Sequence, residues 1–189
     1  MRVDHSWQHG RPQQRLRTRA ESGLTLLELM VVASIIVLVS AIVVPISRAP
    51  YRRDVLNDAT LRLEAWLLEV SRKPNAEGQP CTVTFSTGSN RSGGDQLASV
   101  SPTTCATEAV LSLPTAQGQT FSVGATSNTV VFTRRNSTTS TSNVDLKLAT
   151  SSLTALRCVR VVAISGLLRV GLNNSSADVS QTCNRWNVL

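Results

Sequence analysis

The chain has 189 residues and a formal net charge of +7. This length accommodates one membrane-spanning helix and one globular domain of about 120 residues, and it leaves no room for a second domain. A charge of this size concerns solubility first, so it does not by itself predict nucleic-acid binding.

Residues 1–23 are basic and show no apolar periodicity. They hold five arginines against two carboxylates, together with Gly10 and Pro12. We therefore expect a disordered basic leader. Positive charge ahead of an apolar segment keeps the N-terminus cytoplasmic, so the C-terminal domain is expected on the far side of the membrane.

Residues 24–46 are apolar or small and carry a single charge, Glu28. At about 1.5 Å per residue, a helix of this length crosses a hydrocarbon core roughly 30 Å thick, which predicts a transmembrane helix. A carboxylate in such a helix is costly and needs a cationic partner. If the chain were cut after Gly23, the new α-amino group of Leu24 on a neighbouring copy would supply that cation.

The segment Gly23-Leu24-Thr25-Leu26-Leu27-Glu28-Leu29-Met30-Val31-Val32 resembles the prepilin signature of type IV pilins and type II secretion pseudopilins. In that family a prepilin peptidase cuts after the glycine and methylates the new first residue, here Leu24. The resemblance implies that Glu28, the fifth residue after the cut, serves assembly. Pro45 stands where the family commonly has a helix-kinking proline. Leu24 departs from the family, in which phenylalanine is usual.

Three other interpretations of this segment stay open. Val39-Ser40-Ala41 has the small-residue pattern of a secretory cleavage site, although the apolar run continues beyond it. A plain signal anchor explains the length and the basic flank, but it leaves Gly23 and Glu28 without a role. A buried core helix would exceed the usual length of such helices.

Residues 47–73 are predicted to form an amphipathic helix after an interruption at Arg48-Ala49-Pro50. It should end near Lys73, because Pro74 cannot continue it. Barely two heptads are present, so the apolar stripe is expected to pack on the domain's own sheet and not in a coiled coil. The stripe has spacings of three and four and consists of Leu56, Ala59, Leu63, Trp66 and Val70.

Residues 74–189 are predicted to form an antiparallel β domain. The stretches 88–94 and 136–143 are expected to be exposed loops, and Ser165-Gly166 indicates a tight hairpin. The predicted fold class is α+β, and the resemblance implies a pilin-like fold with a long N-terminal transmembrane helix continuing into a small antiparallel β domain. Strand-like runs fall at residues 81–86, 110–113, 120–123, 129–133, 144–148, 157–164 and 167–172.

Four cysteines lie in the part expected to be exported, where thiols oxidise. They form no C-x-x-C pair and both histidines are in the leader, so two disulfides are expected and a metal site is not. Four cysteines allow three pairings. We choose the sequential one for its locality: Cys81 with Cys105, and Cys158 with Cys183.

Beyond the leader the chain has no histidine, no phosphate-cradling glycine loop and no spaced carboxylate pair. We therefore expect neither an enzyme nor a bound cofactor.

Residues 157–170 are similar to the late hairpin of the minor pseudopilin H and DNA-uptake minor pilin subgroup. That subgroup has a Gly-Arg-x-Arg pattern, whereas Gly166-Leu167-Leu168-Arg169 lacks one arginine. Scattered solvated arginines are favoured over a DNA-binding face, because alternation places Arg157 and Arg160 on opposite sides of a strand. The candidate DNA contacts are Arg157, Arg160, Arg169 and Arg185.

The expected function is structural. The chain would be a minor pilin or pseudopilin, processed by prepilin peptidase, held in the bacterial inner membrane by a single pass, and assembled into a type II secretion pseudopilus or a type IV pilus. Its C-terminal domain would lie in the periplasm or at the cell surface. Expected partners are the peptidase, other pilins or pseudopilins, the inner-membrane assembly platform and the membrane. The alternatives are a DNA-binding minor pilin of competence-type uptake and a plain signal-anchored extracytoplasmic β domain.

Overall fold

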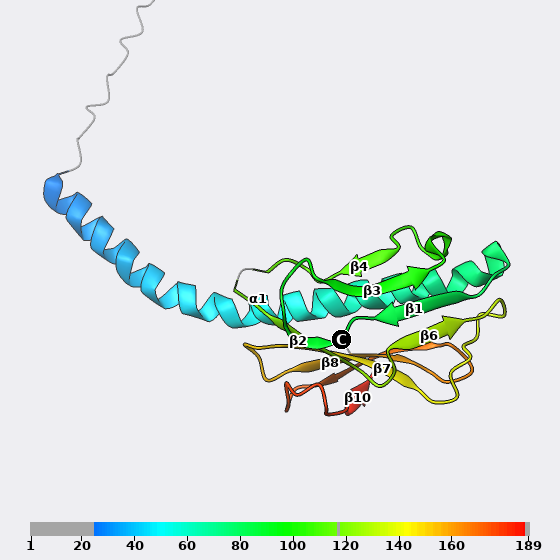
Figure 1. Ribbon diagram of the computed structural model, residues 1–189. Helices are drawn as coiled ribbons and strands as arrows, with labels where there is room; N and C mark the ends of the chain where they lie inside the picture. Colours follow the sequence, from blue (N-terminus) through cyan, green and yellow to red (C-terminus); the bar gives the residue numbers. More distant parts are fainter. Residues whose placement is uncertain (1–24, 117, 188–189) are drawn as a thin grey trace, which may run out of the picture. The chain divides into compact units, whose positions relative to one another are not determined.

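The computed structural model describes residues 25–116 and 118–187, and their side chains except those of residues 41–49. The chain divides into two units, Met1–Ile42 and Val43–Leu189. Helix α1 (Leu26–Glu77) contributes residues to both, and the strands belong to the second unit (Figure 1).

Helix α1 is less interrupted than the sequence predicts. It runs through Pro50 without a break and continues past Lys73 to Glu77. Pro74 has no N–H of its own to donate, but its carbonyl still accepts the N–H of Gly78 at 3.1 Å. Gly78 has a φ of 67°, which a residue without Cβ adopts at little cost. The glycine, and not the proline, therefore ends the helix.

The predicted transmembrane helix is wrong, and with it the predicted fold class. Among the residues that the structure describes, no helix is long and apolar enough to span a membrane. Leu24, at which the predicted span begins, lies outside the described residues.

The later part of α1 supplies one wall of the hydrophobic core. All five residues of the predicted stripe are buried, and Leu67 is buried with them. They form one cluster with apolar side chains from both sheets, including Val83, Phe132 and Leu148. The stripe thus packs on the domain's own sheets, as its short length predicts.

In place of the predicted small β domain, the described residues contain ten strands in two antiparallel sheets (Figure 1). The four-stranded sheet has the order β4 (Val110–Ser112), β3 (Gln96–Ser101), β1 (Cys81–Phe85) and β6 (Thr129–Phe132). The six-stranded sheet has the order β10 (Arg185–Trp186), β9 (Leu168–Asn173), β8 (Leu156–Val161), β7 (Val144–Thr150), β5 (Phe121–Ala125) and β2 (Gly88–Arg91). A short 3-10 helix, η1 (Thr103–Cys105), follows β3.

Three of these strands are missing from the sequence prediction. Strand β2 lies in a stretch predicted to be a loop, because Gly-Ser-Asn-Arg shows no apolar alternation, and it pairs with β5 through a register shift. Strand β3 buries neighbouring residues, Leu97 and Ala98, which breaks the alternation, and β10 has only two residues. Each is extended because it pairs with a neighbouring strand, which a local pattern does not reveal.

The connection between β8 and β9 is wider than the predicted tight hairpin. It takes residues 162–167, in which Ile164 and Gly166 both have positive φ. The N–H of Thr138 donates to the carbonyl of Ile164 at 3.1 Å, and the N–H of Ile164 donates to the carbonyl of Ser140 at 3.1 Å. The neighbouring loop thus holds this connection from outside, and the N–H of Val162 closes it by donating to the carbonyl of Leu167 at 2.8 Å.

Strand β7 is buried along its whole length. One face meets the main core. The other is covered by residues 174–187, which we call the C-terminal strap. Three strap side chains, Ala177, Val179 and Trp186, pack on a small second core formed by Ala149, Leu156, Cys158 and Cys183.

The structure pairs Cys81 with Cys105 and Cys158 with Cys183, which is the sequential pairing chosen from the sequence. No cysteine is free among the described residues. The bridges join residues 24 and 25 positions apart. Each is worth about 3.5 kcal/mol in the chain-entropy model. The first ties β1 to η1, and the second ties β8 to the C-terminal strap.

Candidate functional site

The first turn of α1 is capped by Thr25. Its side-chain Oγ1 accepts the N–H of Glu28 at 3.2 Å, and its carbonyl accepts the N–H of Leu29 at 3.1 Å. A Thr followed three residues later by Glu is the spacing of a capping box, and a carboxylate in the first turn also favours the helix dipole. Glu28 therefore has a local reason for its position, in addition to the predicted role in assembly.

Glu28 is exposed, and among the described residues no cation lies within ion-pair distance of it. The predicted cleavage site, Gly23 and Leu24, lies outside the described residues. Pro45 lies within the range of α1.

The side chains of α1 from Leu26 to Ser40 form an exposed, mostly apolar surface. Its large apolar residues are between 48% and 77% exposed. The two serines add little polarity, because Ser34 Oγ donates to the carbonyl of Val31 at 2.8 Å and Ser40 Oγ donates to that of Ile36 at 2.7 Å. An apolar surface of this extent marks an interaction site. We refer to this surface and Glu28 together as the candidate assembly site.

The four arginines proposed as DNA contacts do not form one face. Arg157 is buried on the side of the sheet that faces α1, where its Nε donates to Asn57 Oδ1 at 2.7 Å. Burial, assisted by the positive charge of Arg53, lowers the pKa of Arg157. Its guanidinium still stays protonated, as arginine does in proteins.

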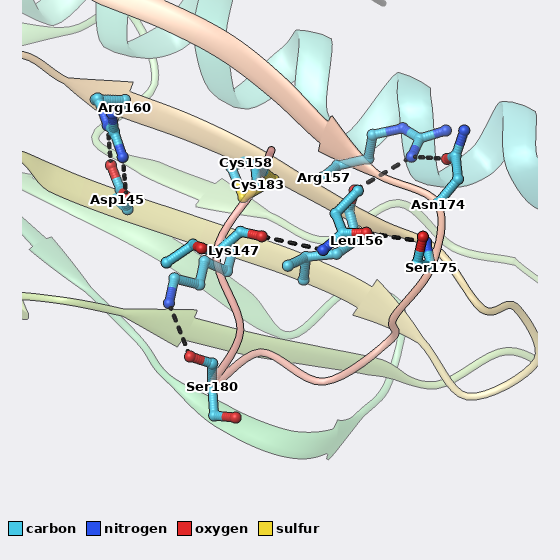
Figure 2. Close-up of a disulfide and its surroundings, with 12 residues drawn as sticks. Asp145, Lys147, Leu156, Arg157, Cys158, Arg160, Asn174, Ser175, Ser180 and Cys183 are labelled. Carbon is cyan, nitrogen blue, oxygen red and sulfur yellow. Dashed lines mark hydrogen bonds and ion pairs between the residues drawn. A yellow bond between two sulfur atoms is a disulfide. The ribbon is translucent and has the colours of Figure 1, made fainter. Parts of the chain in front are cut away.

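Arg160 is engaged on the opposite face of the same sheet (Figure 2). Its Nε and Nη2 donate to the two carboxylate oxygens of Asp145 at 2.6 and 2.7 Å. Its guanidinium also lies 3.9 Å from the centre of the Trp186 ring. The hydrogen bonds to Asp145 also raise the pKa of Arg160. Through its contacts with Asp145 and Trp186, this arginine ties β8 to β7 and to the strap.

Arg169 and Arg185 are exposed. Arg157 and Arg160 are bonded to partners within the fold, and the two arginines that are exposed, Arg169 and Arg185, lie on separate strands. The DNA-binding alternative gains no support from this arrangement.

Two carboxyls are held by hydroxyl and backbone donors. The O–H and N–H of Thr107 both donate to Glu69 at 2.7 Å, and these bonds lower the pKa of Glu69. The O–H and N–H of Ser180 donate to Asp178 at 2.6 and 2.8 Å and lower its pKa, with a further contribution from the positive charge of Lys147. Lys147 itself donates to the Ser180 carbonyl at 3.4 Å, so this group holds the strap on β7 (Figure 2).

One cavity, of about 440 Å³, lies between α1 and the segment that follows η1. It contains Trp66, whose Nε1 donates to the carbonyl of Glu108 at 2.8 Å, and also Glu69. The Glu69 carboxylate already accepts two hydrogen bonds from Thr107. Across the part of the chain that the structure describes, no group of three His, Cys, Asp or Glu side chains is placed to hold a metal ion.

Several of these residues are not among those predicted from the sequence. The Thr25 cap could have been predicted, because the Thr-x-x-Glu spacing is a local signal. The Asp145–Arg160 pair could be predicted only from the register between β7 and β8, in which these two residues lie opposite each other. The contact of Arg157 with Asn57 joins positions 100 residues apart and carries no local signal.

Comparisons with protein-family models, curated proteins and solved structures give no match to this chain. A functional assignment therefore depends on the chain's own residues.

Proposed function

We propose that the chain is a minor pilin or pseudopilin, cut after Gly23 by prepilin peptidase, N-methylated on Leu24, and assembled into a type II secretion pseudopilus or a type IV pilus. One observation carries this proposal. The exposed apolar surface of α1 contains a single carboxylate, Glu28, five positions after the predicted cut.

The candidate assembly site suits contact with other subunits. Its serine hydroxyls are already bonded to the helix backbone, so the apolar surface can be covered without stranding them. Glu28 would then need a cation, because burying an unpaired carboxylate is strongly unfavourable. A Leu24 ammonium on a neighbouring subunit meets that need, and at about 4 Å separation and an effective dielectric of about 20 the attraction is roughly 4 kcal/mol.

The disulfides support the proposed location of the second unit outside the cytoplasm, in the periplasm or at the cell surface. All four cysteines are paired. Such bonds persist in oxidising compartments and are rare in the cytoplasm.

Processing is tested by co-expressing the full chain with a prepilin peptidase and measuring its intact mass. We expect an N-terminus at Leu24 with one added methyl group. A peptidase that lacks activity is the control. Gly23→Val should block the cut, because a branched side chain prevents close approach to the backbone. An N-terminus that stays at Met1 with active peptidase contradicts the proposal.

Assembly is tested with Glu28→Gln against a matched control, Glu77→Gln, which makes the same charge change in the last turn of α1 where the side chain is exposed. We expect Glu28→Gln to be cleaved normally but to enter the sheared filament fraction about tenfold less, equivalent to about 1.4 kcal/mol. Glu77→Gln should assemble like the wild type. Equal incorporation of all three proteins would refute the role of Glu28.

A further inference from the structure

The second unit has a cavity of about 470 Å³ between α1 and β8. Four of its lining residues come from one stretch of α1, and the fifth comes from β8. Arg53 and Asp54 are exposed, so the cavity is open to water on the α1 side. The lining residues are Pro50, Arg53, Asp54, Asn57 and Arg157.

Arg157 is the unusual member of this group, because its side chain is only 6% exposed. Its Nε donates to Asn57 Oδ1 at 2.7 Å. Its Nη1 donates to the Leu156 carbonyl at 3.2 Å and to Asn174 Oδ1 at 3.0 Å (Figure 2). All three acceptors are neutral. A guanidinium has five N–H donors, so the two on Nη2 have no acceptor among the described residues.

Nη2 nevertheless stays reachable. It is not one of the fully buried polar atoms of the described residues that lack a partner, which belong to Gln119, Thr150 and Ser152. Because Arg157 also lines the cavity, its unused N–H edge is available to a small group bound there.

The charge around this edge is unbalanced. Buried cations in proteins are normally paired with an anion. Within the described part of the chain, none of the three charged cavity residues, Arg53, Asp54 and Arg157, takes part in an ion pair. Among the described lining residues, two guanidinium groups and one carboxylate give one net positive charge and free N–H donors.

We propose that this cavity is an anion-binding site that takes a carboxylate, bound by Nη2 of Arg157 and by the guanidinium of Arg53. A single negative charge balances the cavity, whereas a phosphate dianion would exceed its charge and be repelled by Asp54. Hydrogen bonds from guanidinium to carboxylate are among the stronger ones in proteins. The site belongs to the second unit alone and does not depend on the proposed assembly function.

The test is a titration of the full-length protein with sodium acetate, compared with sodium chloride at the same ionic strength of about 0.1 M. The readout is the NMR signal of the arginine side-chain N–H groups, with those of Arg53 and Arg157 assigned by substitution. We expect saturable shifts with acetate and a dissociation constant on the order of 1 mM. Arg53→Gln should weaken binding about fivefold, as loss of one partly exposed charge contact does.

The matched control is Arg52→Gln, which removes the same charge from the neighbouring position, outside the cavity lining. It should bind acetate like the wild type. Because Arg53 is exposed, its variant is expected to fold, which keeps the test informative even if substitution of the buried Arg157 unfolds the domain. Absence of a saturable acetate shift in the wild type, or equal affinity in Arg53→Gln, overturns the proposal.

Two further arms identify the ligand. Inorganic phosphate that binds more tightly than acetate would overturn the choice of a carboxylate. Sedimentation of the full chain then separates the sources: a sedimentation coefficient that falls in acetate but not in chloride assigns the carboxylate to a second copy of the chain. An unchanged coefficient together with acetate binding assigns it to a small organic acid, and both results support the site.

Discussion

Replacing Cys158 and Cys183 together with alanine should destabilise the second unit and release the C-terminal strap. The two residues are 25 positions apart, and the chain-entropy model gives a loss of about 3.5 kcal/mol for removing a bridge over a loop of that length. Alanine is preferred to serine because both cysteines are buried and a hydroxyl would add an unpaired polar group.

The second disulfide provides a matched comparison. Cys81 and Cys105 are 24 positions apart, so their replacement by alanine carries nearly the same entropic loss. Both side chains are fully buried in the main core, so the loss in global stability should be at least as large. The two variants differ in the part of the fold that they affect, because only the Cys158–Cys183 bridge joins the strap to β8.

Urea unfolding of the full chain measures the global loss, and hydrogen exchange separates the two variants. The N–H of Gln181 bonds to the carbonyl of Asp178 at 3.0 Å, and that of Asn187 bonds to the carbonyl of Val170 at 2.7 Å. These amides should exchange faster in the Cys158/Cys183 variant and stay protected in the other under native conditions. A stability loss below about 1 kcal/mol, or equal strap exchange in both variants, would refute the reasoning.

Two further predictions concern charged groups of the second unit. Asp145→Asn should lower the free energy of unfolding in urea by about 2 kcal/mol, which is less than for a fully buried pair because Arg160 is a quarter exposed. Asp58→Asn breaks an exposed pair and should lower it by under about 1 kcal/mol. Equal losses in the two variants would contradict this. Thr107 lowers the pKa of Glu69 below its ordinary value of 4.5, so this contact stabilises the fold fully above pH 4.5 and is lost as the pH falls through the lower folded-state pKa. Glu69→Gln should therefore make stability less dependent on pH below 4.5, and an unchanged dependence would exclude the contact as its cause.

The sequence predicts those parts of the fold that depend on hydrophobic periodicity, and it predicts the pairing of cysteines that are near each other along the chain. The stripe from Leu56 to Val70 is buried because spacings of three and four place its members on one helix face, whatever the partner is. Strands with clear alternation, such as β1, also appear where predicted. The C-terminus of α1 was misplaced because a proline rule was applied where a downstream glycine with positive φ decides the end.

The remaining errors come from contacts between distant segments. Strand β2 is polar and is extended only because β5 pairs with it, and the wide β8–β9 connection exists because the loop around Thr138 bonds to it. The arginines show the same limit. Alternation correctly separates Arg157 from Arg160, yet it says nothing of Asn57 or Asp145, the side chains to which the two guanidinium groups are bonded.

Glu28 lies in the capped first turn of α1 and has a proposed role in assembly, and the contribution of its charge can be tested by itself. Thr25 caps the helix, and cleavage after Gly23 would leave Thr25 in place, so the capped first turn would survive processing. Glutamine at position 28 preserves the capping-box spacing, because Gln serves there as well as Glu, and removes only the charge. Removing the charge also removes its favourable interaction with the helix dipole, which is worth only about 0.3–1 kcal/mol on an exposed helix. A tenfold loss of incorporation corresponds to about 1.4 kcal/mol, so such a defect in Glu28→Gln would report mainly on the cationic partner. Alanine at that position would also remove the capping-box spacing, which is why the amide is the informative substitution.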